Sequence, residues 1–174
     1  MDFHLDTNVL HNLKFVRELS CLAQNHGHQL HVSALVHAER LAQLRRKHGA
    51  KFNASSVKSF LDTHHITIVE IYRDHAEQIA EVLAQVAPDP TTWNQLKWHH
   101  YLNCVGLPPD DRRCPSRKLS STNDWWILAH AAVPVPTPRV VFVTEDRGME
   151  GTHFANHLEV VRAEDALKLA AGGN

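Results

Sequence analysis

Apolar residues in this chain form short runs that alternate with longer stretches of helical spacing. The short runs are typical of buried strands, and they lie at 3–5, 29–32, 66–71, 140–144 and 157–161. Helical spacing covers about 8–22, 34–48, 55–63, 74–86, 122–133 and 163–170. Strands that alternate with helices predict an α/β domain with a mainly parallel central sheet covered on both faces.

Polar residues at the start of these stretches predict where the helices begin. We expect the first helix to start near Asn8, with Leu13 on its apolar face. Ser33 fits the N-cap of the second helix, and Ser55 or Ser56 that of the third. A later helix is expected to start at 122 or 123.

The stretch 88–121 departs from this pattern, because it is rich in turn residues and lacks apolar periodicity. We interpret it as an arm inserted into a single domain that spans residues 1–174. A chain of 174 residues with 43% hydrophobic content is long enough for one domain with a full core.

Four acidic residues stand in separate predicted elements. Asp6 follows the first strand in FHLDTNVL, and Asp146 follows the VVFVT strand. Glu39 falls within the second helix, and Asp124 lies in the first turn of the helix DWWILAHAAV. Each has an ordinary explanation alone, as a cap, a helix-surface acid or a turn residue. Together they predict a site for divalent metal ions, because a hard cation offsets the repulsion among converging carboxylates.

The overall charge gives no sign of nucleic-acid binding, since 18 Lys and Arg balance 19 Asp and Glu. Locally, however, no acid occurs between Arg40 and Lys58, and the arm is also basic. A solvated helix face explains this stretch as well as RNA binding does. The candidate RNA contacts are Arg40, Arg45, Arg46, Lys47, Arg112 and Arg113. Arm aromatics Trp93, Trp98 and Tyr101 suit either base stacking or packing of the arm.

Cysteine and histidine usage argues against other kinds of site. The three cysteines form no CxxC pair, which fits reduced thiols in the cytoplasm. The 15 histidines include no HExxH motif, so we expect most of them at the surface or the edge of the core rather than in a zinc site. The first residues carry no secretory signal pattern, and no apolar run reaches membrane-spanning length.

The motifs LDTNVL, SALVHAERL, NDWWILAHA and VTEDRG resemble the PIN domain family, which includes the VapC-type toxin ribonucleases. The resemblance implies a three-layer α/β/α sandwich and a metal-dependent endoribonuclease that uses Mg²⁺ or Mn²⁺. It also implies an RNA substrate, an antitoxin partner and a homodimer. The arm and the bulky pair Trp125 and Trp126 depart from the family pattern. Carried onto this chain, the catalytic and metal-binding quartet is Asp6, Glu39, Asp124 and Asp146, supported by Asn8 and Thr144.

Two other functions fit parts of the sequence. A PIN-like scaffold without activity would bind RNA or protein, although it would have no need for four acids. A phosphatase of the haloacid dehalogenase type would use an aspartate after the first strand as its nucleophile. That family has a second aspartate two positions later, where this chain has Asn8.

Overall fold

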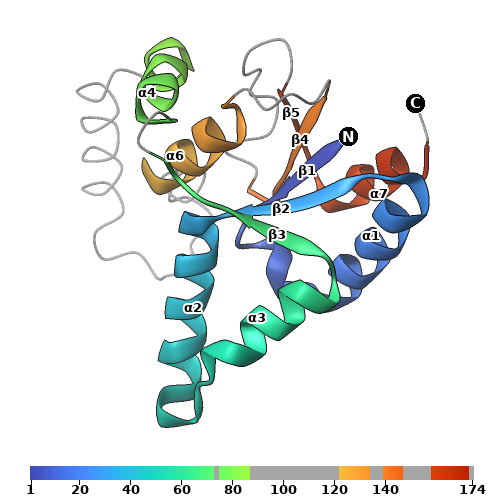
Figure 1. The fold of residues 1–174 in the computed structure, drawn as a ribbon, viewed down its shortest axis with the longest axis vertical. Coiled ribbons are helices and arrows are strands. Elements are labelled where there is room, and N and C mark those ends of the chain that lie inside the picture. Colours follow the sequence, from blue (N-terminus) through green and yellow to red (C-terminus); the bar gives the residue numbers. More distant parts are fainter. Residues whose placement is uncertain (73–74, 87–121, 134–138, 147–157, 173–174) are drawn as a thin grey trace, which may run out of the picture.

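The computed structural model describes residues 1–72, 75–86, 122–133, 139–146 and 158–172. Its sheet has five parallel strands in the order β3-β2-β1-β4-β5, as Figure 1 shows. The strands are β1 Asp2–Leu5, β2 Gln29–Ser33, β3 Ile66–Val69, β4 Val140–Val143 and β5 Leu158–Val161. The predicted parallel sheet is therefore confirmed. The expected arm at 88–121 lies outside the described residues, so the single-domain interpretation stays a prediction.

The strand order changes direction between β1 and β4. The chain runs outward from β1 through β2 to β3, and then returns to place β4 and β5 on the other side of β1. β1 and β4 end level with each other, because Leu5 pairs with Val143. In open α/β sheets, ligands bind outside the carboxyl ends of the strands at such a reversal.

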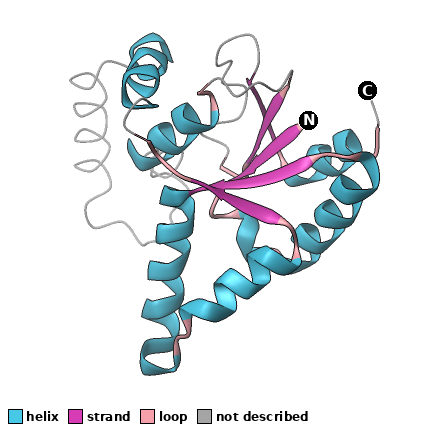
Figure 2. Ribbon diagram, viewed as in Figure 1, coloured by secondary structure: helices cyan, strands magenta, loops and turns pink. Residues whose placement is uncertain are grey.

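Helices lie on both sides of the sheet (Figure 2). α1 packs against α7 on one side, whereas α6 packs against α4 on the other. α2 and α3 extend beyond the sheet as a V-shaped pair joined by η2 (Figure 1). The helices are η1 Val9–His11, α1 Leu13–His26, α2 Ala34–His48, η2 Gly49–Lys51, α3 Ala54–Thr63, α4 His75–Val86, α6 Thr122–Ala131 and α7 Ala163–Ala170.

The core is built on the two central strands. Phe3 and Leu5 of β1 and all four residues of β4 are buried. They belong to one apolar cluster with Val16 and Leu19 of α1 and Leu128 of α6. Burial of this apolar surface supplies the main driving force for folding and fixes where the ends of β1 and β4 lie. In the described part of the chain, no helix is long and apolar enough to cross a membrane.

Two predicted helix starts are wrong, and in both cases an asparagine explains the difference. α1 begins at Leu13 rather than near Asn8, because the Asn12 side chain accepts a hydrogen bond from the Phe15 N–H. Leu13 is consequently 46% exposed instead of buried. α3 is capped by Asn53 rather than by either serine.

The predicted cap of α2 is confirmed, since the Ser33 hydroxyl accepts a hydrogen bond from the Val36 N–H at 3.1 Å. Val36 is the one fully buried residue of α2, so most of this helix lies at the surface. The helix therefore presents Glu39 on an exposed face, next to the ends of β1 and β2.

Candidate functional site

Asp6 lies directly after β1 and is buried, with 5% of its surface exposed. Its backbone N–H donates to the Val143 carbonyl oxygen at 3.0 Å, which ties it to the end of β4. Its carboxylate accepts three hydrogen bonds, from the Thr7 N–H at 2.6 Å, the Asn8 side chain at 2.8 Å and the Thr144 hydroxyl at 2.7 Å. Hydrogen bonds to a carboxylate favour its charged form, so this environment suits an ionised aspartate.

The Thr144 hydroxyl joins the loops that follow β1 and β4. It donates to Asp6 and accepts from the Asn8 side chain and the Asp146 N–H, both at 3.0 Å. A hydroxyl has one donor and two acceptor sites, and all three are used here. Asn8 makes a second link, because its Oδ1 accepts from the Glu145 N–H at 3.0 Å. The two predicted supporting residues thus contact both Asp6 and the loop that carries Asp146.

Glu39 reaches the same place from α2. Its Oε2 accepts a hydrogen bond from the Thr7 hydroxyl at 2.6 Å, and its Oε1 accepts one from Gln43 at 3.2 Å. The structure therefore links two of the four predicted acids through Thr7. We call the set Asp6, Thr7, Asn8, Glu39 and Thr144 the carboxylate network.

The structure describes fewer side-chain contacts for the other two predicted acids, Asp146 and Asp124. The Asp146 side chain is half-buried, and its backbone N–H contacts Thr144 as described. Asp124 lies in the first turn of α6, where the positive end of the helix dipole favours a carboxylate. The side chain of Asp124 lies outside the described residues. Among the side chains that are described, no three of His, Cys, Asp or Glu are grouped so that they could hold a metal ion.

The oxygen atoms that could bind a metal at this edge of the sheet are nevertheless of one chemical kind. Asp6, Glu39 and Asp146 offer carboxylate oxygens, and Thr144 adds a hydroxyl. Hard divalent cations such as Mg²⁺ prefer oxygen ligands, whereas thiols and imidazoles suit softer metals. The residues at this edge of the sheet therefore fit Mg²⁺ or Mn²⁺ better than Zn²⁺.

Glu145 and Arg162 hold the loop after β4 and were missed by the sequence reasoning. The Glu145 carboxylate accepts from the Ala163 N–H at 3.1 Å, at the start of α7, and pairs with Arg162 at 2.7 Å. These contacts fix the backbone next to Asp146. Thr7 was also missed, although it stands between two predicted residues in the LDTN motif. No local pattern reveals its partner, which lies 32 positions away.

The predicted RNA-contacting residues occupy different places. Arg40 is near the site, with its guanidinium donating to a ring nitrogen of His11 at 2.6 Å. The exposed Arg45, Arg46 and Lys47 lie in the last turn of α2, roughly 9 Å or more along the helix from Glu39. Arg112 and Arg113 lie outside the described residues.

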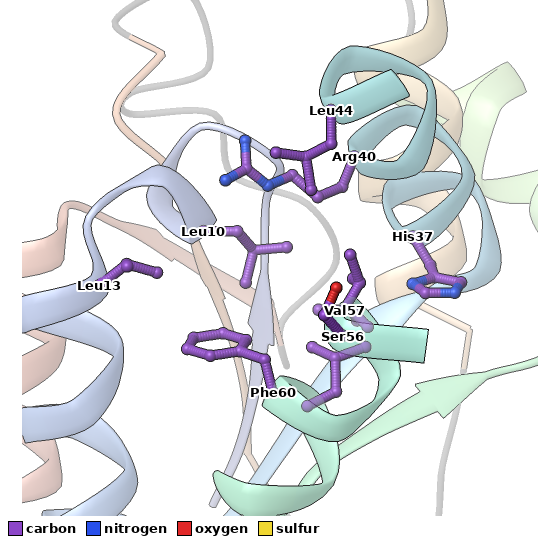
Figure 3. A pocket seen from close by; sticks show the side chains of 10 residues that line it. Leu10, Leu13, His37, Arg40, Leu44, Ser56, Val57 and Phe60 are labelled. Atoms are coloured by element: carbon purple, nitrogen blue, oxygen red, sulfur yellow. The ribbon is translucent and has the colours of Figure 1, made fainter. Parts of the chain in front are cut away.

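An apolar pocket of about 210 Å³ opens between η1, α2 and α3 (Figure 3). Leu10, Leu44 and Phe60 point into it, and the Arg40 side chain borders it.

A second polar region lies between the sheet and α6. We call His4, His31, His75 and His130 the histidine group. The rings of His4 and His31 are 5.0 Å apart, and those of His75 and His130 are 5.8 Å apart. Within the described residues, several buried ring nitrogens of this group make no hydrogen bond. His4 and His130 are thus interior residues, unlike the surface positions expected for most histidines.

Burial lowers the pKa of three of these histidines. Burial, together with the neighbouring His31 and His130, lowers the pKa of His4 to about 3. Burial also lowers the pKa of His130, with a contribution from His75 and an opposing one from the Glu70 backbone. The pKa of His31 is lowered by burial against the opposing effect of Asp2. His4, His31 and His130 are therefore neutral at pH 7.

A scan against protein-family models finds no match for this chain, and a search of curated proteins finds none either. Solved structures do match. One is VapBC-1 from nontypeable Haemophilus influenzae, with a TM-score of 0.52, 18% identity and coverage of 94% of this chain and 99% of that one. Another is VapBC2 from Rickettsia felis bound to a DNA fragment from their promoter, with a TM-score of 0.51, 18% identity and coverage of 93% and 98%.

These similarities establish the fold. The match extends over nearly the full length of each chain. The predicted PIN-like three-layer α/β/α sandwich is therefore confirmed. At 18% identity the comparison carries no residue roles, so the chemistry rests on the site itself.

Proposed function

We propose that this protein is a metal-dependent endoribonuclease, the toxin of a VapBC-type toxin–antitoxin pair that acts in the cytoplasm. The observation that carries the proposal is the hydrogen-bonded link between Asp6, Glu39 and Thr144 at the reversal point of the sheet. The PIN-like fold and the similarity to VapBC structures support the same conclusion.

Asp6, Glu39, Asp124 and Asp146 would hold Mg²⁺ or Mn²⁺ in this proposal. When bound, the cation supplies Lewis-acid stabilisation of the charge that develops on the phosphoryl oxygens. The chain's own residues do the positioning. Thr144 and Asn8 orient the Asp6 carboxylate, and the Glu145–Arg162 pair holds the loop that carries Asp146.

The RNA substrate would bring further negative charge to an acidic site, so cations near the site should bind its phosphates. Arg40 is the described cation nearest in sequence to Glu39 and lies beside the apolar pocket. We propose that Arg40 contacts the phosphate backbone of the RNA. Arg45, Arg46 and Lys47 would extend this contact along α2, and Arg112 and Arg113 remain candidates from the sequence.

The proposed partner is an antitoxin protein, and we further expect the protein to form a homodimer. The apolar pocket suits one or two anchor side chains from a protein partner, since interfaces concentrate their binding energy in such buried anchors. Co-purification with the product of the adjacent reading frame tests this part. Phe60→Ala should weaken that complex, whereas a complex unaffected by the change would place the interface elsewhere.

The nuclease activity is tested by RNA cleavage in Mg²⁺ or Mn²⁺ with the wild type, Asp6→Asn and Asp124→Asn. We expect both substitutions to abolish cleavage and to weaken Mn²⁺ binding by more than about tenfold. Asp62→Asn removes an exposed acid of α3 and serves as the matched control. Metal-dependent cleavage that survives both site substitutions would refute the site. A wild type that binds no Mn²⁺ would favour an inactive scaffold, and an aspartyl-phosphate on Asp6 would favour a phosphatase.

A further inference from the structure

Thr7 contacts both acids of the carboxylate network at once. It is buried, with 4% of its surface exposed, in the turn between β1 and η1. Its backbone N–H donates to Asp6 Oδ1 and its hydroxyl donates to Glu39 Oε2, both at 2.6 Å. A single residue therefore sets the position of two carboxylates that come from different elements.

Glu39 depends on this contact more than Asp6 does. Asp6 is enclosed by three donors, but Glu39 is an exposed residue on a surface helix. A free glutamate side chain there would sample several rotamers, and fixing it in one of them costs conformational entropy. The Gln43 contact at 3.2 Å comes from the same helix, so within the described residues only the hydrogen bond from Thr7 links Glu39 to the end of β1.

We propose that Thr7 is a positioning residue that holds Glu39 at a fixed place relative to Asp6, so that both carboxylates are preorganised for a divalent cation. The inference rests on the proposed function and adds a residue to it. A hydroxyl suits the task because it donates its hydrogen to a carboxylate, which can only accept. Branching at Cβ restricts the χ1 rotation of the threonine and so directs the hydroxyl.

A purely structural role makes a different prediction. If Thr7 only fastened α2 to the sheet, removal of its hydroxyl would lower stability and leave metal affinity unchanged. If it positions Glu39, metal affinity should fall even where the chain remains folded. The loss should also require the Glu39 carboxylate.

The experiment measures Mn²⁺ binding by calorimetry, thermal unfolding without metal, and the Mg²⁺ dependence of RNA cleavage. The full chain is compared as wild type, Thr7→Val and Thr7→Ser. We expect Thr7→Val to weaken Mn²⁺ binding by about tenfold to a hundredfold and to raise the Mg²⁺ concentration for half-maximal cleavage by a similar factor. Thr7→Ser keeps the hydroxyl and should restore most of the affinity.

Two further variants make the result specific. Thr63→Val is the matched control, because it removes an exposed hydroxyl that donates within α3 to the Ser59 carbonyl oxygen. In a Glu39→Gln background, Thr7→Val should cause a much smaller additional loss of affinity, since the two residues act through one contact. If Thr7→Val does not fold, Thr7→Cys replaces the hydroxyl by a weak thiol donor, and its comparison with Thr7→Ser tests the same contact.

The outcomes separate this inference from the proposed function. A folded Thr7→Val chain that binds Mn²⁺ as tightly as the wild type would overturn the role of Thr7, even if the wild type cleaves RNA. An equal loss in the wild-type and Glu39→Gln backgrounds would also overturn it. A wild type that neither binds Mn²⁺ nor cleaves RNA would instead overturn the proposed function.

Discussion

The carboxylate network and the histidine group both contain buried polar side chains, yet they are built in opposite ways. In the network, the Asp6 carboxylate accepts three hydrogen bonds and the Thr144 hydroxyl uses all of its sites. In the histidine group, ring nitrogens of His4 and His130 are buried without hydrogen-bond partners in the described chain. The network surrounds the Asp6 carboxylate with hydrogen-bond donors, whereas burial keeps His4, His31 and His130 neutral.

This difference identifies which region is prepared for a ligand. Holding an ionised aspartate in the interior requires donors placed around it, and the chain supplies them from two loops. A neutral imidazole has one donor and one acceptor, and its burial costs much less than the burial of an ion. The histidine group is therefore part of the packing between α6 and the sheet, despite its number of titratable side chains.

Among the changes that test this comparison, Thr144→Val should cause the largest loss of stability. It removes a hydroxyl from the network and keeps the shape of the side chain. Asp6 loses a donor and the Asp146 N–H loses an acceptor. We expect the free energy of unfolding to fall by about 1.5–3 kcal/mol, the range for hydrogen bonds to charged groups. Urea unfolding measures it, with Thr67→Val on the exposed side of β3 as the control. Equal losses in the two variants would show that the network adds no stability.

Acidification should act on the histidine group. The folded pKa of His4 is about 3, against 6.5 for the unfolded chain, so the unfolded state binds more protons between these values. Stability should therefore be full above pH 6.5 and fall as the pH drops. His4 alone contributes about 1 kcal/mol per pH unit in this window. Urea unfolding at pH 7.5, 6 and 5 measures this dependence. A free energy of unfolding that does not change with pH would mean that the histidines are solvated in the folded state.

The smallest effect should come from His130→Leu, which replaces a buried imidazole by an apolar group of similar volume. Because neither ring nitrogen has a close hydrogen-bond partner among the described residues, we expect the free energy of unfolding at pH 7.5 to stay within about 1 kcal/mol of the wild type. The variant should also lose less stability at pH 5 than the wild type does. A large loss at pH 7.5 would indicate that the histidine group contributes polar interactions like those of the network.

Much of the fold could be predicted from the sequence, because strand and helix periodicity is a local signal. The buried run at Val140–Val143 and the helix from Ala34 to His48 are examples. Helix starts were predicted less well, since several polar residues compete to cap each helix. Asn12 and Asn53 took positions that the pattern gave to Asn8 and to Ser55 or Ser56.

The site could be predicted only in part, for a physical reason. Asp6 and Thr144 each follow a recognisable strand, and parallel strands bring their carboxyl ends to one edge. The contacts of Thr7 and Glu145 depend on how α2 and α7 are seated on the sheet, which no local motif encodes. The burial of His4 and His130 depends in the same way on the packing of α6.

The hydrogen bond between Thr144 and Asp6 also has a consequence for the order of events during synthesis. The two residues are 138 positions apart, so Asp6 leaves the ribosome long before its partner is made. Until β4 pairs with β1, the carboxylate lacks the donor and the neighbouring loop that shape its surroundings. A chain interrupted before Thr144 cannot complete the network, which makes its assembly one of the last steps in the production of the protein.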